Sequence, residues 1–414
     1  MEKSILLVHY SGPPEIGGVE RVLRGQARVL KRFGHPVGLA VGVGKSFESG
    51  IPVHVIPEMD SRHPTVRRVQ EELQRGQVPT QFVILKAKLK ERLTDLAGRY
   101  PIWIVHNIAT MPQNLALTAA IRDLVEEGVI ERLVLWHHDL AWGNPRYHWV
   151  VREEIPWVLL RHPWPKKVEH VAISEMRRGQ IAELYGLPKE RIRVIPNGID
   201  AADFFRWRAS TLRLIEEVDL LSADLILLQP VRITPRKNLE WALEIVHALK
   251  KISGWEIRLI VTGPPDRHRE DGAAYWERLL EKRKQLGLER EVRFPCAERE
   301  LANITREVVI DLYTLADGVL LTSDEEGFGL PVLEAGLARV PVFARYLPPL
   351  DEAGNGHVFF FQPEDPPEKI AQMILKELDA DLPGRLRRRV RREFFWEAIY
   401  KRFLRPFLEE IVKR

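Results

Sequence analysis

The chain has 414 residues, of which 45% are hydrophobic and 29% charged, with 62 basic and 58 acidic side chains and a formal net charge of +4. This length predicts two domains rather than one core, and the composition is that of a soluble globular protein. A charge this small does not indicate nucleic-acid binding. The single cysteine, Cys296, excludes an internal disulfide, no apolar run reaches the length of a membrane span, and the N-terminus enters a strand directly. We therefore expect a cytoplasmic protein without a signal peptide.

The first predicted element is a buried strand at residues 4–10, S-I-L-L-V-H-Y. A loop containing Gly17 and Gly18 follows, and apolar spacing over residues 19–33 predicts a helix. A strand, a glycine loop and a helix start can hold a phosphate in an α/β sheet. The loop is not G-x-G-x-x-G and lacks the lysine of a Walker loop, so it favours neither dinucleotide nor ATP binding.

Further strands are predicted at residues 36–43, 53–56 and 102–106. The helix predicted over residues 82–100 carries a row of cations, Lys86, Lys88, Lys90 and Arg92. Such a helix can contact an anionic membrane surface. Glu91 and Asp95 dilute the charge, so we favour a solvated face.

The strand predicted at residues 133–136 ends in His137, His138 and Asp139. Carboxyl ends of strands are where α/β sheets place their chemistry. A histidine here can orient an acceptor hydroxyl or bind a transferred sugar, or it can simply satisfy local backbone groups. His106 ends the preceding strand in the same way.

Five aromatic residues follow in an irregular, proline-containing segment: Trp142, Tyr147, Trp149, Trp157 and Trp164. Such rings stack on sugars or, more often, pack a core. This segment is where we place acceptor selectivity. A strand at residues 168–174, a helix ending at Tyr185 and a strand before the turn Asn197-Gly198 complete the first domain, and we place a linker at residues 201–223.

The second domain opens with a strand at residues 224–231 and a loop carrying Arg232 and Lys237. Fixed cations there would stabilise a leaving diphosphate more in the transition state than in the ground state, although two basic loop residues alone would read as a solvated face. Strands are also predicted at residues 257–262, 292–295, 340–343 and 359–362, and a terminal helix at residues 396–412.

The most informative stretch is the predicted strand at residues 318–322 followed by S-D-E-E-G-F-G-L-P-V-L-E-A-G-L. Glycines let the backbone approach a ligand, and the free N–H groups of a helix start suit a phosphate. Glu326 and Glu334 flank the turn eight residues apart and can accept hydrogen bonds from vicinal hydroxyls.

The patterns E-G-F-G-L-P-x-L-E-A, R-x4-K-N, S-G-x4-G-G-V-E-R and V-x-V-I-P-N-G-I-D resemble the retaining nucleotide-sugar glycosyltransferases of family 4, also called group 1. The resemblance implies an α/β fold of GT-B architecture, with two facing Rossmann-like domains and a C-terminal helix that crosses back to the first. The implied domains are residues 1–205 with 394–414, on the acceptor side, and residues 206–393, which bind the nucleotide sugar.

The resemblance also implies the site residues. It assigns catalytic roles to His138, Arg232, Lys237 and Glu326, with no metal because the two cations neutralise the diphosphate. It assigns donor binding to Gly17, Gly18, Phe328, Gly329, Leu330 and Glu334. The acceptor-side candidates are His106, His137 and Asp139; relatives carry one histidine at this strand end, often followed by aspartate, and we favour His138 over His137.

The implied reaction moves a hexose, with retention, from a UDP-, GDP- or ADP-sugar to a hydroxyl of a sugar, lipid or small solute. No cofactor is expected, nor a nucleic-acid partner; peripheral membrane contact is not favoured, and the oligomeric state stays open. The alternatives are a glycoside phosphorylase or nucleotide-sugar epimerase on the same fold, and a non-catalytic sugar-nucleotide-binding protein.

Three features stand outside this pattern. Arg339 occupies a position where the family usually has glycine. Asp379-Ala380-Asp381 has the D-x-D form of a metal site in another glycosyltransferase fold, but it lies off any strand end, and we discount it. The basic run at residues 385–392 reads as a solvated helix face rather than an anion site.

Overall fold

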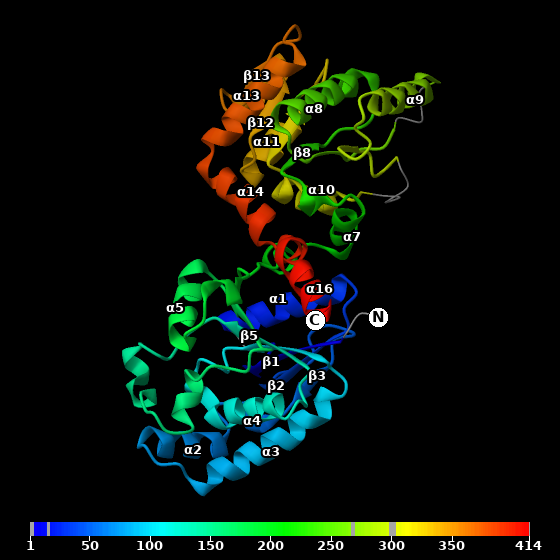
Figure 1. Ribbon diagram of the computed structural model, residues 1–414. Coiled ribbons are helices and arrows are strands. Elements are labelled where there is room, and N and C mark those ends of the chain that lie inside the picture. The colour runs from blue at the N-terminus through cyan, green and yellow to red at the C-terminus, as the bar shows by residue number, and fades with distance from the viewer. Residues whose placement is uncertain (1–3, 15–16, 266–269, 298–303, 414) are drawn as a thin grey trace. The chain divides into compact units, whose positions relative to one another are not determined.

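The computed structural model describes residues 4–14, 17–265, 270–297 and 304–413 (Figure 1). The chain divides into two compact units, Met1–Asp200 with Phe394–Arg414, and Ala201–Glu393. The sequence analysis places this boundary at 205/206. Each unit is built on its own parallel sheet, and every predicted strand is present.

The first unit has a seven-stranded sheet in the order β3-β2-β1-β4-β5-β6-β7, in which neighbouring strands are parallel. Its strands are β1 Ile5–Ser11, β2 Val37–Val43, β3 Val53–Val55, β4 Ile102–His106, β5 Arg132–His137, β6 Glu169–Ala172 and β7 Ile192–Val194. The order reverses between β1 and β4, which is the switch point where open α/β sheets bind ligands.

Helices cover both faces of this sheet, as Figure 1 shows. The helices of the first unit are α1 Gly18–Arg32, α2 Pro64–Gln74, α3 Thr80–Ala97, α4 Leu115–Glu126, α5 Glu175–Tyr185, α15 Trp396–Ile399 and α16 Arg405–Lys413, with single turns at Pro57–Met59, Pro112–Asn114, Pro145–Val150, Trp157–Leu160 and Lys189–Arg191. Two apolar cores result. One joins Leu6 and Val8 to α3 and α4, and the other joins Ile5 and Leu7 to α1 and α16. Alternate residues of β1 thus enter opposite cores, which explains its continuous apolar run.

The C-terminal segment packs on the first unit, as expected. The predicted helix at residues 396–412 is interrupted by a π-helical turn at Tyr400–Leu404. Trp396 is buried between two glycines: an added Cβ on Gly25 of α1 would lie 1.8 Å from its indole nitrogen, and one on Gly198 would lie 2.4 Å from its ring. Gly198, which the sequence marks only as a turn residue, therefore makes room for this indole.

The second unit has a six-stranded parallel sheet in the order β10-β9-β8-β11-β12-β13. Its strands are β8 Leu225–Gln229, β9 Ile257–Val261, β10 Val292–Arg293, β11 Gly318–Leu321, β12 Val342–Arg345 and β13 Phe359–Phe361. The first strand of this unit again lies at the switch point, now beside β11. The same strand order is therefore used twice.

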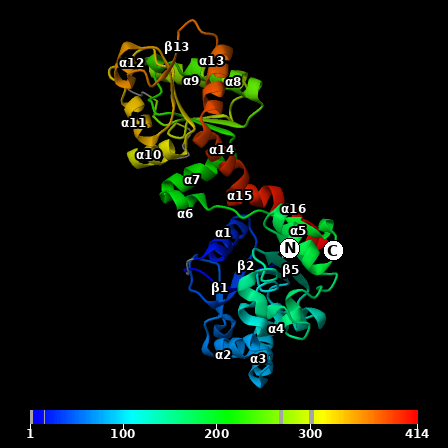
Figure 2. The same ribbon diagram turned by 90° about the vertical axis from the view of Figure 1, so that its left-hand side faces the viewer.

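The helices of the second unit are α6 Ala201–Phe205, α7 Ala209–Glu217, α8 Leu239–Ser253, α9 Glu270–Gln285, α10 Arg306–Leu315, α11 Leu330–Ala338, α12 Pro348–Gly354, α13 Pro367–Ala380 and α14 Leu382–Phe394, with single turns at Leu220–Ser222 and Pro235–Lys237. Helices α8 and α13 lie side by side (Figure 2). Asp379 and Ala380 of the D-x-D sequence end α13, away from any strand end.

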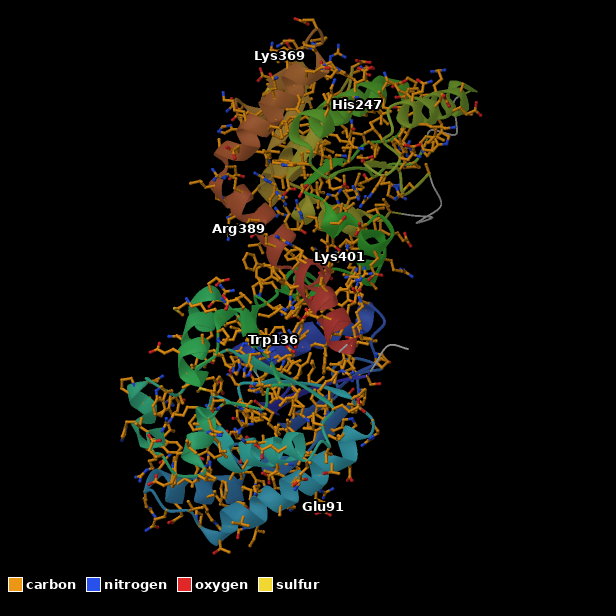
Figure 3. All side chains as sticks on the ribbon, viewed as in Figure 1. Glu91, Trp136, His247, Lys369, Arg389 and Lys401 are labelled. Carbon is orange, nitrogen blue, oxygen red and sulfur yellow. The ribbon has the colours of Figure 1, made fainter. Side chains whose placement is uncertain are left out.

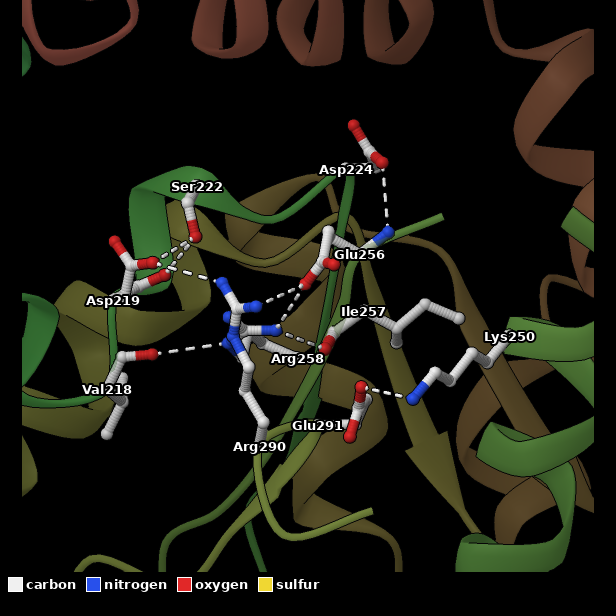
Figure 4. A network of polar contacts seen from close by, with 10 residues as sticks. All are labelled: Val218, Asp219, Ser222, Asp224, Lys250, Glu256, Ile257, Arg258, Arg290 and Glu291. Carbon is white, nitrogen blue, oxygen red and sulfur yellow. Dashed lines mark hydrogen bonds and ion pairs between the residues drawn. The ribbon is translucent and has the colours of Figure 1, made fainter. Parts of the chain in front are cut away.

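The segment predicted as a linker, residues 201–223, is instead part of the second unit. Leu214 and Ile215 of α7 are buried, and the fully buried Arg258 of β9 donates to the carbonyl of Val218 at 3.2 Å (Figure 4). Arg290 lies 3.5 Å from both Asp219 and Glu256 in the same network. The prediction was wrong because one buried arginine on a distant strand attaches this segment to the sheet.

The basic run at residues 385–392 is also not a simple solvated face. Arg391 is buried and binds Asp317 through two hydrogen bonds of 3.1 and 2.6 Å, while Arg388 donates to the carbonyl of Leu378 at 2.6 Å. Arg389, by contrast, is exposed on the outside of α14 (Figure 3). The arginines therefore alternate between attaching α14 to its unit and facing solvent.

Arg339 takes the left-handed conformation, with φ of 57°, and closes α11 where the family usually has glycine. The N–H of Val340 donates to the carbonyl of Ala335 in this cap, so β12 begins at Val342 rather than at residue 340. A non-glycine residue in this region carries a small backbone strain.

Among the described residues, no helix is long and apolar enough to cross a membrane. The cations of α3 are partly neutralised by ion pairs, which join Lys86 to Asp123, Lys88 to Glu58 and Lys90 to Glu127. Glu91 of the same helix lies at the outer surface, whereas Trp136 lies in the packed interior (Figure 3).

Replacing either of two glycines inside helices by alanine should change the free energy of unfolding, but in opposite directions. Gly179→Ala in α5 meets open space and should stabilise the protein by up to about 1 kcal/mol through helix propensity. In Gly25→Ala the added methyl group would clash with the enclosed Trp396 ring, so this substitution should destabilise the protein by about 1–3 kcal/mol. Urea unfolding followed by tryptophan fluorescence measures both. Equal stabilisation by the two substitutions would contradict the described packing of Trp396.

Candidate functional site

The strand order of the second unit brings two distant sequence motifs to one sheet edge. Val319 of β11 pairs with Leu228 of β8, so the loop after β8 and the turn after β11 lie beside each other. The first carries Arg232 and Lys237, and the second carries Glu326 and the start of α11. This edge is the carboxyl end of the switch point, where α/β folds bind ligands.

The centre of this site is an ion pair between Lys237 and Glu326. Lys237 Nζ lies 2.5 Å from Glu326 Oε1, and only 8% and 11% of their side-chain surfaces are exposed. Ser323 Oγ donates to the same oxygen at 2.7 Å. Two partners on Oε1 fix the carboxylate, and no hydrogen bond to its second oxygen comes from the part of the chain that the structure describes.

The backbone around the pair is held by buried hydrogen bonds. Gln229 Nε2 donates to Thr322 Oγ1 at 2.9 Å, and that hydroxyl donates to the carbonyl of Lys237 at 3.0 Å. The N–H of Asp324 donates to the carbonyl of Arg236 at 2.8 Å. The two loops are therefore joined at several points, so the lysine and the glutamate are held in register.

Arg232 is exposed at the same edge. An added Cβ on Gly263, which follows β9, would lie 2.3 Å from the carbonyl oxygen of Val231 and 2.6 Å from Arg232 Cα. A glycine at the end of a strand can allow close approach to a nucleotide. In the structure the close contact of Gly263 is with the backbone that carries Arg232.

Glu334 lies one turn inside α11 and is held by two side chains from α10. Tyr313 donates its hydroxyl to Glu334 Oε2 at 2.9 Å, and Arg306 lies 3.3 Å from Oε1. Burial is the main cause that raises the pKa of Tyr313, followed by its hydrogen bond to Glu334. This phenol therefore remains a donor to the carboxylate at ordinary pH.

The turn before α11 leaves backbone exposed beside these carboxylates. Gly329 has φ of 102°, a conformation that favours glycine, and its added Cβ would lie 2.9 Å from Leu350. Phe328 and Leu330 are 57% and 60% exposed. The three residues predicted to hold a donor through their N–H groups thus form the open start of α11.

In the first unit, three histidines lie on the α1 side of the sheet. His9 lies near the carboxyl end of β1 and donates from Nδ1 to the carbonyl of His106 at 3.0 Å, and His106 Nδ1 lies 2.9 Å from His138 Nε2. His106 Nε2 is buried and has no partner among the described residues. Burial lowers the pKa of His138 to about 3, and it also lowers the pKa of His9 and His106.

His137 faces the opposite side of the sheet. Its Nε2 lies 3.1 Å from Nδ1 of His170, and the two rings stack with centroids 5.4 Å apart, close to Tyr185. Burial lowers the pKa of His170 to about 4 and that of His137 well below its usual value. The structure therefore brings His138, and not His137, to the cluster with His106.

Asn107, which follows His106 at the end of β4, fixes the turn that carries His138. It has φ of 61°, and its Oδ1 accepts from the N–H groups of His138 at 2.8 Å and Asp139 at 3.0 Å. Its Nδ2 donates to Asp139 Oδ2 at 3.2 Å. An asparagine directly after a strand does not by itself predict that its side chain supports the end of another strand some thirty residues later.

Gly17 and Gly18 begin α1 at the same sheet edge, although residues 15 and 16 of their loop lie outside the described structure. An added Cβ on Gly17 would lie 2.0 Å from Glu20 Oε2, whereas one on Gly18 meets nothing within 4 Å. Ser11 donates to Glu20 Oε1 at 2.5 Å, and His9 Nε2 lies 4.0 Å from that oxygen. Glu20 thus joins this loop to the histidine cluster.

A cleft of about 1150 Å³ opens in the first unit at the loops after β4 and β5. Asp139, Trp142 and Tyr147 line it together with residues of α5. Two of the aromatic residues predicted for acceptor selectivity thus lie in its wall, whereas Trp157 and Trp164 are buried in the core.

No group of three or more candidate metal ligands occurs within the described part of the chain.

Comparison with known proteins connects both units to one group of enzymes. The profile of Glycosyltransferase Family 4 matches residues 16–203, and that of Glycosyl transferases group 1 matches residues 214–393. Mannosylglucosylglycerate synthase of Petrotoga mobilis is 27% identical over 261 residues, 58% of this chain and 58% of that protein. The protein of the same name from Thermotoga maritima is 23% identical over 366 residues, 82% of this chain and 79% of its own length.

A further relative is D-inositol 3-phosphate glycosyltransferase of Kineococcus radiotolerans, 32% identical over 182 residues, 42% of this chain and 38% of that protein. The match thus spans little more than half of the Petrotoga protein and less than two fifths of the Kineococcus protein. Among solved structures, sucrose-phosphate synthase from Thermosynechococcus elongatus covers all of both chains at 18% identity, with a TM-score of 0.39.

The buried histidines predict an acid-sensitive fold. His138 and His170 stay neutral when folded, but each takes up a proton below a pKa of about 6.5 when unfolded. Their contribution to stability is therefore present above pH 6.5 and is lost as the pH falls toward their folded values of about 3 and 4. Lowering the pH from 7 to 5.5 should therefore reduce the free energy of unfolding by about 1 kcal/mol for each of these two histidines.

Urea unfolding at the two pH values measures this loss. His170→Gln should reduce the pH dependence, whereas His148→Gln, at an exposed position, should leave it unchanged. An unchanged free energy of unfolding across this range would contradict the buried neutral state of these rings.

Proposed function

Because the chain belongs to the glycosyltransferases of group 1 and family 4, we propose that it transfers a hexose from a nucleotide-diphosphate sugar to an acceptor hydroxyl, with retention of configuration. The observation that carries the proposal is the ion pair of Lys237 with Glu326 at the switch point of the second unit, in the turn that leads into the helix of Glu334.

The cations of this edge act on the leaving group. Charge on the diphosphate grows as the bond from the sugar C1 to the phosphate oxygen breaks. Lys237 is nearly buried, so its charge is weakly screened, and Arg232 is exposed beside it. Both stabilise the developing charge more than the ground state. We expect no metal to be needed for this step.

The two glutamates recognise hydroxyl groups. Glu326 is held through Oε1 by Lys237 and Ser323, which leaves Oε2 to accept from hydroxyls of the donor sugar. Glu334 accepts from the ribose, and the N–H groups of Phe328, Gly329 and Leu330 bind the sugar and diphosphate at the start of α11. These roles follow the family pattern and fit the exposure of the α11 start.

We place the acceptor at the carboxyl edge of the first unit, near His138. Its imidazole is neutral, so it can accept or donate one hydrogen bond without adding charge. In the retaining reaction, the acceptor oxygen forms the new bond to C1, and its proton passes to the departing phosphate oxygen. His106 and Asn107 hold the histidine, and Gly17 and Gly18 offer backbone to the diphosphate or acceptor.

A thermal-shift panel of UDP, GDP, ADP and their sugar conjugates, with and without magnesium, tests the donor site. A ligand at 100 times its Kd should raise the Tm of the second unit by about 5–10 °C. Glu334→Ala should raise the Kd at least about tenfold, because hydrogen bonds to a charged group are lost. Glu325→Ala, at an exposed neighbour in the same turn, is the matched control and should have no effect. Absence of any nucleotide shift would contradict the proposal.

Tyr313 should act as a positioning residue for Glu334. Tyr313→Phe removes the 2.9 Å hydrogen bond while keeping the ring, so it should raise KM for the donor several-fold and leave kcat nearly unchanged. Steady-state kinetics with the nucleotide sugar identified above measures this separation. An equal fall in kcat would argue instead for a direct role of Tyr313 in the chemical step.

A further inference from the structure

The side chains that line the cleft of the first unit indicate the charge of its ligand. It occupies about 1150 Å³, enough for a molecule of disaccharide size. Three arginines reach it from three different segments: Arg146 from the turn Pro145–Val150, Arg161 from the segment after Trp157–Leu160, and Arg177 from α5. Their convergence is independent of the donor-site residues, which all lie in the second unit.

Two of these guanidinium groups are held by aromatic rings of the cleft wall. The Arg161 guanidinium carbon lies 4.9 Å from the centroid of Trp142, and that of Arg146 lies 5.7 Å from the centroid of Tyr147. Stacking of this kind orients the flat guanidinium and leaves its edge N–H groups for a ligand. The arginines are thus partly arranged before any ligand binds.

Several of the donors in this set are unsatisfied by the protein. The Nε atoms of Arg161 and Arg177 are buried and have no hydrogen-bond partner within the described ranges. Arg146 is exposed and forms no ion pair with any residue that the structure describes. An anion in the cleft would interact with the positive charge of all three guanidinium groups, and it would meet Arg146 without displacing a protein carboxylate.

The carboxylates near the cleft neutralise part of this charge. Asp139 Oδ2 accepts from Asn107, and its Oδ1 forms an ion pair with Arg177 at 3.8 Å, which is longer than a hydrogen bond. Glu153 pairs with Nη2 of Arg161, which leaves the Nε of that arginine unengaged. Glu183 is the remaining acid in the lining and is exposed on α5.

We propose that this cleft binds the acceptor, and that the acceptor is a sugar or polyol carrying a phosphate or carboxylate group. This inference rests on the proposed function, which supplies the transfer reaction. What it adds is that the acceptor carries an acidic group. Arg146, Arg161 and Arg177 bind the acidic group through charge-assisted hydrogen bonds, and the rings of Trp142 and Tyr147 contact the carbon skeleton. Asp139 joins the cleft to the transfer site, since its N–H shares Asn107 Oδ1 with that of His138.

The test is isothermal titration calorimetry of the full chain with three matched probes, glucose, glucose 6-phosphate and glucuronate, at constant ionic strength. Each titration is done with and without the nucleotide diphosphate that the thermal-shift panel identifies. One or both acidic sugars should bind at least about tenfold more tightly than glucose, as expected for a charge-assisted hydrogen bond. The probe that binds more tightly tells whether phosphate or carboxylate is preferred.

Variants locate the effect. Arg146→Gln and Arg177→Gln should each weaken binding of the acidic sugar about fivefold or more and leave glucose unchanged. Arg178→Gln, at the next residue of α5 and outside the cleft lining, is the matched control. Arg146 makes no ion pair with the described residues, so its substitution carries little risk to folding.

The inference is overturned if all three sugars bind equally or not at all, or if Arg178→Gln weakens binding as much as Arg177→Gln does. It is also overturned if inorganic phosphate binds as tightly as glucose 6-phosphate, because the site would then be an adventitious anion site. Retained nucleotide shifts alongside any of these results would leave the donor site intact. Loss of the nucleotide shifts would instead contradict the proposed function.

Discussion

The candidate donor site depends on one interaction, the nearly buried ion pair between Lys237 and Glu326. Neither charge is stable alone at this degree of burial, so each requires the other when no ligand is bound. The pair joins the loop after β8 to the turn after β11, and the buried hydrogen bonds of Gln229 and Thr322 hold those two segments in register. In the proposed reaction Lys237 also contacts the diphosphate, and Oε2 of Glu326 accepts from the sugar while Oε1 stays with Lys237 and Ser323. Both members of the pair therefore contact the donor from positions that are fixed before it binds.

The same strand order, used once in each unit, explains how distant motifs become neighbours. In the second unit it brings residues some ninety positions apart to the ends of β8 and β11, and in the first it brings His9, His106 and His138 to the ends of β1, β4 and β5. The two edges differ in electrostatics. The second unit offers permanent charges, whereas the first offers imidazoles that burial keeps neutral. Charged groups suit a diphosphate, and neutral groups suit an acceptor hydroxyl.

The sequence predicts the strands and the α/β alternation because apolar runs are local signals, whereas the charged site residues are assigned through the resemblance of their motifs to the family. It does not predict Tyr313, Ser323 or Asn107 as supports, since each acts through a contact made by folding. The choice between His137 and His138 depends on which face of β5 each occupies, and that follows from the strand's exact end. The supposed linker at residues 201–223 belongs to the second unit because Arg258, on a separate strand, binds the carbonyl of Val218. Gly198 has its role only once Trp396 has packed against it.

The most direct test is a double-mutant cycle on the central pair, with Lys237→Met, Glu326→Gln and both together. Calorimetry would measure the affinity of each variant for a nucleotide diphosphate with and without its sugar. The account predicts that Lys237→Met weakens both ligands at least about tenfold, that Glu326→Gln weakens only the sugar conjugate, and that the two substitutions couple by about 1 kcal/mol or more. The account would be contradicted if the two substitutions changed the binding free energy additively within about 0.5 kcal/mol. It would also be contradicted if Glu326→Gln left the affinity for the sugar conjugate unchanged.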